Sequence, residues 1–185
     1  AGRFDRAVSS RLTPGVLLDP AKLREILAGC PTEKLPPESG VLIKHPWQLI
    51  KENAAEIIRQ CGLTPMDLAG RIADGAHLLN GSAIHVGAGS NIKPGSVLDA
   101  ESGPIYIGEN VTIHACAVIQ GPCCIGDGCT IQPGAAVRGG SSIGMVCKIG
   151  GEVEGTIFHG YSNKQHDGFI GHSYIGEWVN LGADT

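Results

Sequence analysis

The chain has 185 residues, which is enough for one domain and a smaller attachment. Its formal net charge is -4, and no cluster of Lys or Arg supplies the positive surface that nucleic acid or an anionic membrane requires. No apolar run is long enough to span a membrane and no charged-then-apolar leader opens the sequence, so we expect a cytoplasmic protein with a small-molecule partner.

Two helices are predicted before the middle of the chain. Asp19 and Pro20 begin a short helical stretch that Gly29 ends. A longer amphipathic helix is expected over residues 45–62, with a helical linker over 45–80. The apolar face of this helix comprises Trp47, Ile50, Ala54, Ile57 and Cys61.

From about Ser82 an aliphatic residue returns every six positions, a period that fits neither an α-helix nor an ordinary strand. The regular series comprises Ile107, Ile113, Ile119, Ile125, Ile131, Val137, Ile143 and Ile149, and an earlier phase comprises Val86, Ile92 and Leu98. Glycines spaced by eighteen (Gly108, Gly126 and Gly144) group three hexads into one repeat. A hexapeptide repeat is the signature of a parallel β-helix in which each hexad makes one short strand and one turn.

The fifth place of each hexad is small or β-branched. Its members are Ser90, Ser96, Val111, Ala117, Cys123, Cys129, Ala135, Ser141, Cys147 and Val153. Three of the seven Cys residues lie in this set and no Cys-x-x-Cys spacing occurs, so we interpret them as reduced interior residues rather than metal ligands. By resemblance to proteins with the same hexad pattern, we expect a left-handed β-helix over 81–185, a mainly β fold preceded by the short α-helical segment.

The hexads lose their register after Ile149, and we expect it to return at Phe169, Ile175 and Leu181. Residues 150–168 are therefore predicted to bulge or loop out of the coil, and they hold His159, Tyr161, Ser162, Asn163, Lys164, His166 and Asp167. A polar segment of this kind on a rigid scaffold is where chemistry is usually placed, although an ordinary solvated insertion remains open. The insertion at 99–104 carries no such cluster, and we interpret it as structural.

The segment "HDGFIGHSYIGEWVNLGADT" resembles the C-terminal acetyltransferase half of GlmU-type bifunctional sugar-1-phosphate nucleotidyltransferase/acetyltransferases. The motifs "YSNKQHDGF", "GHSY" and "WVNLGA" resemble more closely the GlmU-like sugar nucleotidyltransferase subgroup of that family. The resemblance covers roughly residues 45–185. It implies acetyl-CoA as co-substrate, an amino-sugar phosphate as acceptor, and a homotrimer whose subunits form the cofactor groove. It also implies that His166 is the general base toward the sugar amine, that Asn180 lies near the acceptor, and that Gly182 and Ala183 line the acetyl-CoA strip.

Three positions depart from the pattern of that family. Phe169 stands where the acetyltransferases have a phosphate-contacting Tyr, Glu154 stands where they have a phosphate-binding Lys, and Asp184 replaces a Gly. Lys164 is a candidate for the missing cation. The expected acceptor-binding residues are therefore Asn163, Lys164, Phe169, Asn180 and Asp184.

His166 and Asp184 are eighteen residues apart, so the hexad register places them at equivalent points of successive coils. We predict that the Asp184 carboxylate orients the His166 imidazole. The alternative is that Asp184 is a solvated corner residue.

The Gly-x-Gly-Thr-Arg-Met loop of the nucleotidyltransferase half does not occur in the sequence, which opens without Met and stops within the hexad pattern. We therefore expect a fragment truncated at its C-terminus, in which residues 1–44 are the tail of a missing nucleotidyltransferase domain. Mg²⁺ is expected only for that absent domain.

Three functions remain in competition. The leading one is an acyltransferase that acts on a sugar phosphate. The second is a β-helix that trimerises and holds a catalytic domain without catalysis of its own. The third is a zinc hydratase resembling γ-class carbonic anhydrase, but His159, His166 and His172 converge poorly on one metal within a chain, and no metal site is predicted.

Overall fold

The computed structural model describes residues 6–30 and 40–183, and the chain divides into two compact units, 1–42 and 43–185. The described part of the first unit is helical, with α1 (Arg6–Ser9), α2 (Pro14–Leu17) and α3 (Pro20–Leu27). The Asp19 carboxylate accepts hydrogen bonds from the backbone N–H groups of Ala21 and Lys22, at 3.1 and 3.2 Å. The predicted helix and its N-cap are thus confirmed.

The second unit opens with the predicted amphipathic helix, α4 (Pro46–Cys61). The Gln48 side chain closes its first turn by accepting hydrogen bonds from the N–H groups of Lys44 and His45, at 2.7 and 2.9 Å. Ile57 and Cys61 are buried as expected, whereas Trp47 of the predicted apolar face is exposed. None of the helices in residues 6–30 and 40–183 is long and apolar enough to cross a membrane.

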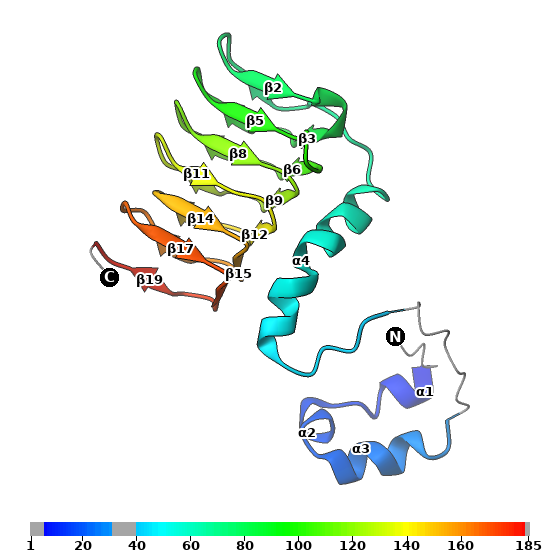
Figure 1. Ribbon diagram of the computed structural model, residues 1–185. Helices are drawn as coiled ribbons and strands as arrows, with labels where there is room; N and C mark the ends of the chain where they lie inside the picture. Colours follow the sequence, from blue (N-terminus) through cyan, green and yellow to red (C-terminus); the bar gives the residue numbers. More distant parts are fainter. Residues whose placement is uncertain (1–5, 31–39, 184–185) are drawn as a thin grey trace. The chain divides into compact units, whose positions relative to one another are not determined.

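After α4 the chain winds through three parallel sheets, each of which receives one strand from every coil (Figure 1). The β1 sheet contains β1 (Arg71–Ile72), β4 (Asn91–Ile92), β7 (Thr112–Ile113), β10 (Thr130–Ile131), β13 (Lys148–Ile149), β16 (Asn163–Lys164) and β19 (Asn180–Leu181). The β2 sheet contains β2 (His77–Leu79), β5 (Val97–Asp99), β8 (Val118–Gln120), β11 (Ala136–Val137), β14 (Glu152–Glu154) and β17 (Phe169–Gly171). The β3 sheet contains β3 (Ile84–Val86), β6 (Ile105–Ile107), β9 (Cys123–Ile125), β12 (Ser141–Ile143), β15 (Ile157–Phe158) and β18 (Tyr174–Ile175).

This arrangement is the parallel β-helix predicted from the hexads, preceded by a helical segment, and it is consistent with the left-handed winding that the resemblance implied. Its first coil also holds a 3₁₀ turn, η2 (Gly81–Ala83). Strands β1 and β2 lie in the range 45–80 that was expected to be a helical linker. The β-helix therefore begins before residue 81.

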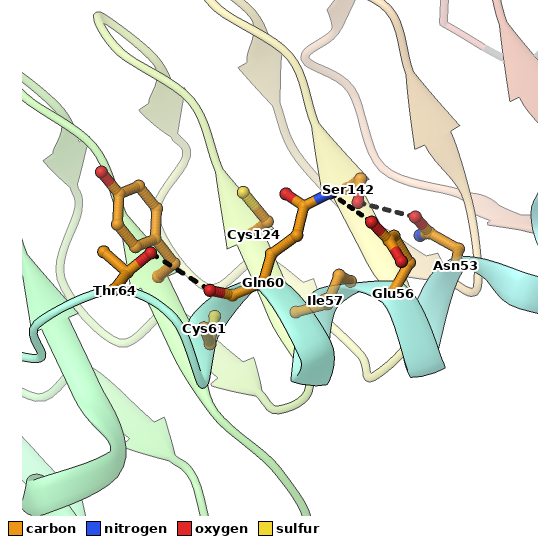
Figure 2. A pocket seen from close by; sticks show the side chains of 9 residues that line it. Asn53, Glu56, Ile57, Gln60, Cys61, Thr64, Cys124 and Ser142 are labelled. Carbon is orange, nitrogen blue, oxygen red and sulfur yellow. Dashed lines mark hydrogen bonds between the residues drawn. The ribbon is translucent and has the colours of Figure 1, made fainter. Parts of the chain in front are cut away.

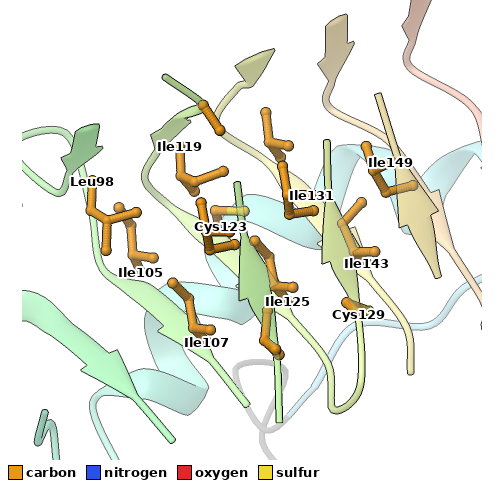
Figure 3. Packing of buried hydrophobic residues seen from close by; sticks show 14 of the residues in the cluster. Leu98, Ile105, Ile107, Ile119, Cys123, Ile125, Cys129, Ile131, Ile143 and Ile149 are labelled. Atoms are coloured by element: carbon orange, nitrogen blue, oxygen red, sulfur yellow. The ribbon is translucent and has the colours of Figure 1, made fainter. Parts of the chain in front are cut away.

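The interior is a stack of aliphatic side chains that repeats from coil to coil (Figure 3). All eight members of the regular series are at most 2% exposed. In the β1 sheet Ile113, Ile131 and Ile149 are direct Cα partners in three successive coils, so each side chain packs on an identical one. Backbone hydrogen bonds between coils hold this stack at the strand spacing of roughly 4.8 Å.

The residues at the fifth place of each hexad are buried as predicted. Cys123, Cys129 and Cys147 are among them, and each is at most 1% exposed. Burial raises the pKa of the Cys123 thiol, so that thiol is neutral at physiological pH. These residues have the interior packing role that the sequence predicted.

The expectation that residues 150–168 loop out of the coil is wrong. Strands β14, β15 and β16 lie in this segment and pair with the preceding and the following coil. The coil is shortened instead, because Ile149 and Lys164 are Cα partners only fifteen residues apart. By contrast, Ile131 and Ile149 are eighteen apart.

Two serines at the fifth place of the hexad provide a matched test of interior hydrogen bonding. Ser90 Oγ donates to Gly108 O at 2.7 Å and accepts from the Val111 N–H at 2.9 Å, whereas the buried Ser141 Oγ has no partner. Ser90→Ala leaves two buried backbone groups unpaired and is expected to lower the free energy of unfolding by about 1–3 kcal/mol. Ser141→Ala is expected to be neutral or stabilising, and denaturant titration of both variants checks the difference.

Candidate functional site

The sequence-predicted site residues that the structure describes lie around the corner where β16 of the β1 sheet leads into β17 of the β2 sheet. Asn163 and Asn180 are Cα partners on β16 and β19. His166 is exposed in the turn that follows β16. Gly182 and Ala183 follow β19 as Gln165 and His166 follow β16, by the same seventeen-residue step. The corner therefore offers an imidazole that can take a proton, with carboxamides on the adjoining strands.

Lys164 does not point outward to serve as a phosphate-binding cation. Its side chain occupies an interior position of the β1 sheet between Ile149 and Leu181, and it is 6% exposed. The ammonium donates hydrogen bonds to Gly150 O at 2.8 Å, to His166 O at 3.1 Å and to Gly168 O at 2.8 Å. Because an ammonium has three donors, this group is saturated, and the expectation that Lys164 contacts the acceptor is wrong for this arrangement.

The predicted pairing of His166 with Asp184 requires an eighteen-residue step between their coils. The observed step is seventeen, since Asn163 pairs with Asn180 and Lys164 with Leu181. The same step relates His166 to Ala183. Asp184 itself lies outside the described residues.

Phe169 does not hold the interior register at β17. Its side chain is 62% exposed, and Ile170 pairs with the interior Val153 instead. Phe169 and Glu152 are Cα partners on the outer face of the β2 sheet, as are Gly171 and Glu154. Phe169 thus lies on the surface beside Glu152, whose carboxylate is paired with the Arg138 guanidinium.

A histidine and a carboxylate on successive coils do meet elsewhere. His159 Nδ1 lies 3.5 Å from Glu177 Oε1, and both side chains are about half exposed. In the same two turns the rings of Tyr161 and Trp178 stack with centroids 4.8 Å apart. His159 and Glu177, which are eighteen residues apart, thus have the relation that was expected of His166 and Asp184.

No three His, Cys, Asp or Glu residues come close enough to hold a metal ion within residues 6–30 and 40–183 of a single chain. His159, His166 and His172 therefore form no three-ligand cluster inside one chain.

A cavity of about 360 Å³ lies between α4 and the outer face of the β3 sheet (Figure 2). Its polar side chains largely bond one another: Ser142 Oγ donates to Asn53 Oδ1 at 2.9 Å, and Gln60 Nε2 donates to Glu56 Oε1 at 2.7 Å. Burial raises the pKa of the Cys124 thiol in its wall to about 11, so this thiol is protonated at neutral pH. The sequence predicted the helix but not the cavity, since no local pattern shows which outward strand residues a helix will cover.

The regular coils of the β-helix are similar to a known protein family. Residues 104–139 match the family model for the bacterial transferase hexapeptide (six repeats). The matched segment runs from β6 to β11 and ends before the corner that carries His166. Over these residues the chain is similar to the hexapeptide repeat of bacterial transferases. No curated protein matches the sequence.

Close approach of the 165–168 turn to the preceding coil requires glycine at position 151. A Cβ on Gly151 would lie 2.6 Å from Gly168 O and 2.8 Å from Lys164 Nζ, and its φ is +65°. Gly134 has a φ of +70° with no atom within 4 Å of the added carbon. We expect Gly134→Ala to cost about 1–2 kcal/mol for the left-handed backbone, and Gly151→Ala about 1–3 kcal/mol more for the clash. Equal losses in denaturant titration would show that the turn does not pack as described.

Proposed function

We propose that the protein is an acyltransferase that moves an acetyl group from acetyl-CoA to the amine of an amino sugar, with His166 as the general base. The observation that carries the proposal is the corner between the β1 and β2 sheets. There the exposed imidazole of His166 follows strand β16, and the paired strands β16 and β19 present Asn163 and Asn180. The regular coils before this corner match a bacterial transferase repeat.

In the proposed reaction the sugar amine attacks the thioester carbonyl. The imidazole of His166 accepts a proton from the amine as the C–N bond forms, because histidine titrates near neutral pH. The C–S bond then breaks, and the proton leaves with the thiolate of coenzyme A as a thiol. Asn163 and Asn180 are proposed to hold the acceptor by hydrogen bonds, and the backbone of Gly182 and Ala183 to line the path of the cofactor.

The acceptor need not carry a phosphate. Lys164 has its three donors engaged inside the coil, and the phenyl ring of Phe169 has no hydrogen-bond donor to offer a phosphate. We therefore expect an amino sugar and its 1-phosphate to be acetylated with similar acceptor KM values. A KM at least tenfold lower for the phosphate would show that a cation from another part of the protein or from a second subunit reaches the site.

Removing the base should affect the chemical step. His166→Asn is expected to lower kcat by about 10²- to 10⁴-fold with little change in the Kd of acetyl-CoA, because Asn keeps a polar side chain but cannot take the proton. His172→Asn is the matched control, since His172 is also exposed and Asn tolerates its positive φ of 45°. Acetyl transfer measured as thiol release tests both variants. Equal activity of the wild type and His166→Asn would remove His166 from the mechanism.

The second candidate is a β-helix that assembles subunits without catalysis. It is favoured by the structural use of Lys164 and by the apolar Phe169, since neither serves a phosphorylated acceptor. Calorimetry with acetyl-CoA separates the two functions. Binding at micromolar to submillimolar concentration supports the transferase, and no binding at millimolar concentration supports the scaffold.

We also propose that the protein works as a homotrimer, on the strength of the resemblance given above for its hexads and C-terminal motif. Sedimentation equilibrium should give three times the chain mass of 19.2 kDa. A monomer that nevertheless transfers acetyl groups would show that one chain holds a complete site.

A further inference from the structure

The turn that carries His166 is bonded to Lys164, a lysine whose side chain lies inside the coil where neighbouring coils have an aliphatic residue. Along the β1 sheet the interior positions of neighbouring coils hold Ile131, Ile149, Lys164 and Leu181. A lysine is rarely buried without partners, because removing an ammonium from water is costly. The contacts of Lys164 therefore show what its charge does at this position.

Those contacts all go to turn carbonyls. One acceptor, Gly150 O, lies in the turn after β13, and the other two, His166 O and Gly168 O, lie in the turn after β16. The ammonium thus joins the 165–168 turn to the turn of the preceding coil. One of the three bonds is made to the main-chain oxygen of His166 itself.

The shortened coil explains why a cation is needed. The residues are lost mainly at the turn after β13, where the interior Ile149 and Val153 are four positions apart, whereas Lys164 and Ile170 at the turn after β16 are six apart. The 165–168 turn is thus longer than the turn on which it lies, and a Cβ on Gly150 would lie 2.2 Å from Gln165 O. Gly168 O also accepts from the Glu152 N–H at 3.0 Å, so an aliphatic side chain at position 164 would deprive Gly150 O and His166 O above all of their donor.

Charge around the ammonium is consistent with this role. Burial lowers the pKa of Lys164, and the Asp167 carboxylate in the same turn opposes that shift. Three charge-assisted hydrogen bonds also favour the protonated form.

We propose that Lys164 is a positioning residue for His166. Its ammonium fixes the main chain of the 165–168 turn, and so holds the exposed imidazole at one place on the corner. The catalytic part of this inference rests on the proposed function, whereas the anchoring of the turn does not. Positioning matters for a general base because a displacement of about 1 Å can cost about 10²-fold in rate.

The test compares Lys164→Met with Lys148→Met. Met retains most of the length of the lysine stem and removes the ammonium, and Lys148 is an exposed lysine on the neighbouring strand β13 of the same sheet. For Lys164→Met we expect amide hydrogen exchange at Gly150 and Glu152, whose N–H groups donate to Lys164 O and Gly168 O, to accelerate at least tenfold, while exchange in strands β4 to β10 is unchanged. For Lys148→Met we expect no change in either region. Unchanged exchange at Gly150 and Glu152 in Lys164→Met would overturn the proposal.

Kinetics then separate positioning from simple loss of structure. Lys164→Met is expected to lower kcat by about 10- to 100-fold with an acceptor KM within about twofold of the wild type. In a His166→Asn background the same change should have no further effect on the residual rate, because Lys164 acts through His166. An equal loss of rate in both backgrounds would contradict the proposal.

Two further results keep the outcomes distinguishable. Lys164→Arg retains a cation with several donors, and we expect it to keep more of the rate and of the turn protection than Lys164→Met. If Lys164→Met does not fold, Lys164→Arg replaces it in the exchange measurement. Because Lys164→Arg keeps a cation, complete loss of exchange protection in that variant would then count against the proposal. If the wild type transfers no acetyl group, the proposed function fails, and the exchange measurement alone decides whether Lys164 holds the turn.

Discussion

The structure depends on the match between each coil and the next. The strands pair their backbone N–H and C=O groups with the neighbouring coils, and interior side chains such as Ile113, Ile131 and Ile149 pack directly on their counterparts. A β-helix has no core apart from this stack, so the length of a coil determines both its hydrogen bonds and its packing. Where successive coils have the same eighteen-residue length, identical side chains meet and little else is required of the sequence.

The candidate site lies where that regularity ends. Between Ile149 and Lys164 the coil is three residues shorter than its predecessor, and two of the three are lost at the turn after β13. The turn after β16 keeps the regular interval of six, from Lys164 to Ile170, and lies on this shorter turn. Three carbonyl oxygens of these two turns accept from the Lys164 ammonium. Lys164 stands where the neighbouring coils have Ile149 and Leu181. The outside of the turn after β16 presents His166. One irregularity therefore creates both the buried polar contact and the exposed functional group, which is how a repetitive scaffold can carry a specific site.

The match between successive coils also determines how much of the structure can be predicted from the sequence. The interior from Ile107 to Ile149 was predicted residue by residue, because one residue class returned at one period. Beyond it the intervals change, and extrapolation at a period of six selected Phe169 where Ile170 is interior. An error of one residue moves a side chain to the opposite face of a strand. Lys164 could not be found by hydropathy, since its burial depends on three carbonyls that only the folded turn brings together. Likewise, the apolar face of α4 was visible in the sequence, but the strands that it covers were not.

Helix α4 changes how the coils depend on one another. It runs along the β3 sheet (Figure 1) and contacts β9, β12 and β18. The Asn53 side chain donates to Gly140 O and accepts from Ser142 Oγ. In a solenoid held only by adjacent contacts, repeats can open one after another from an end. Because α4 bridges coils that are not adjacent, peeling away the coil that holds β18 also removes contacts of the helix that stabilises β9. The consequence is mechanical: this face of the solenoid resists stepwise unravelling, and its coils are expected to open as one cooperative unit.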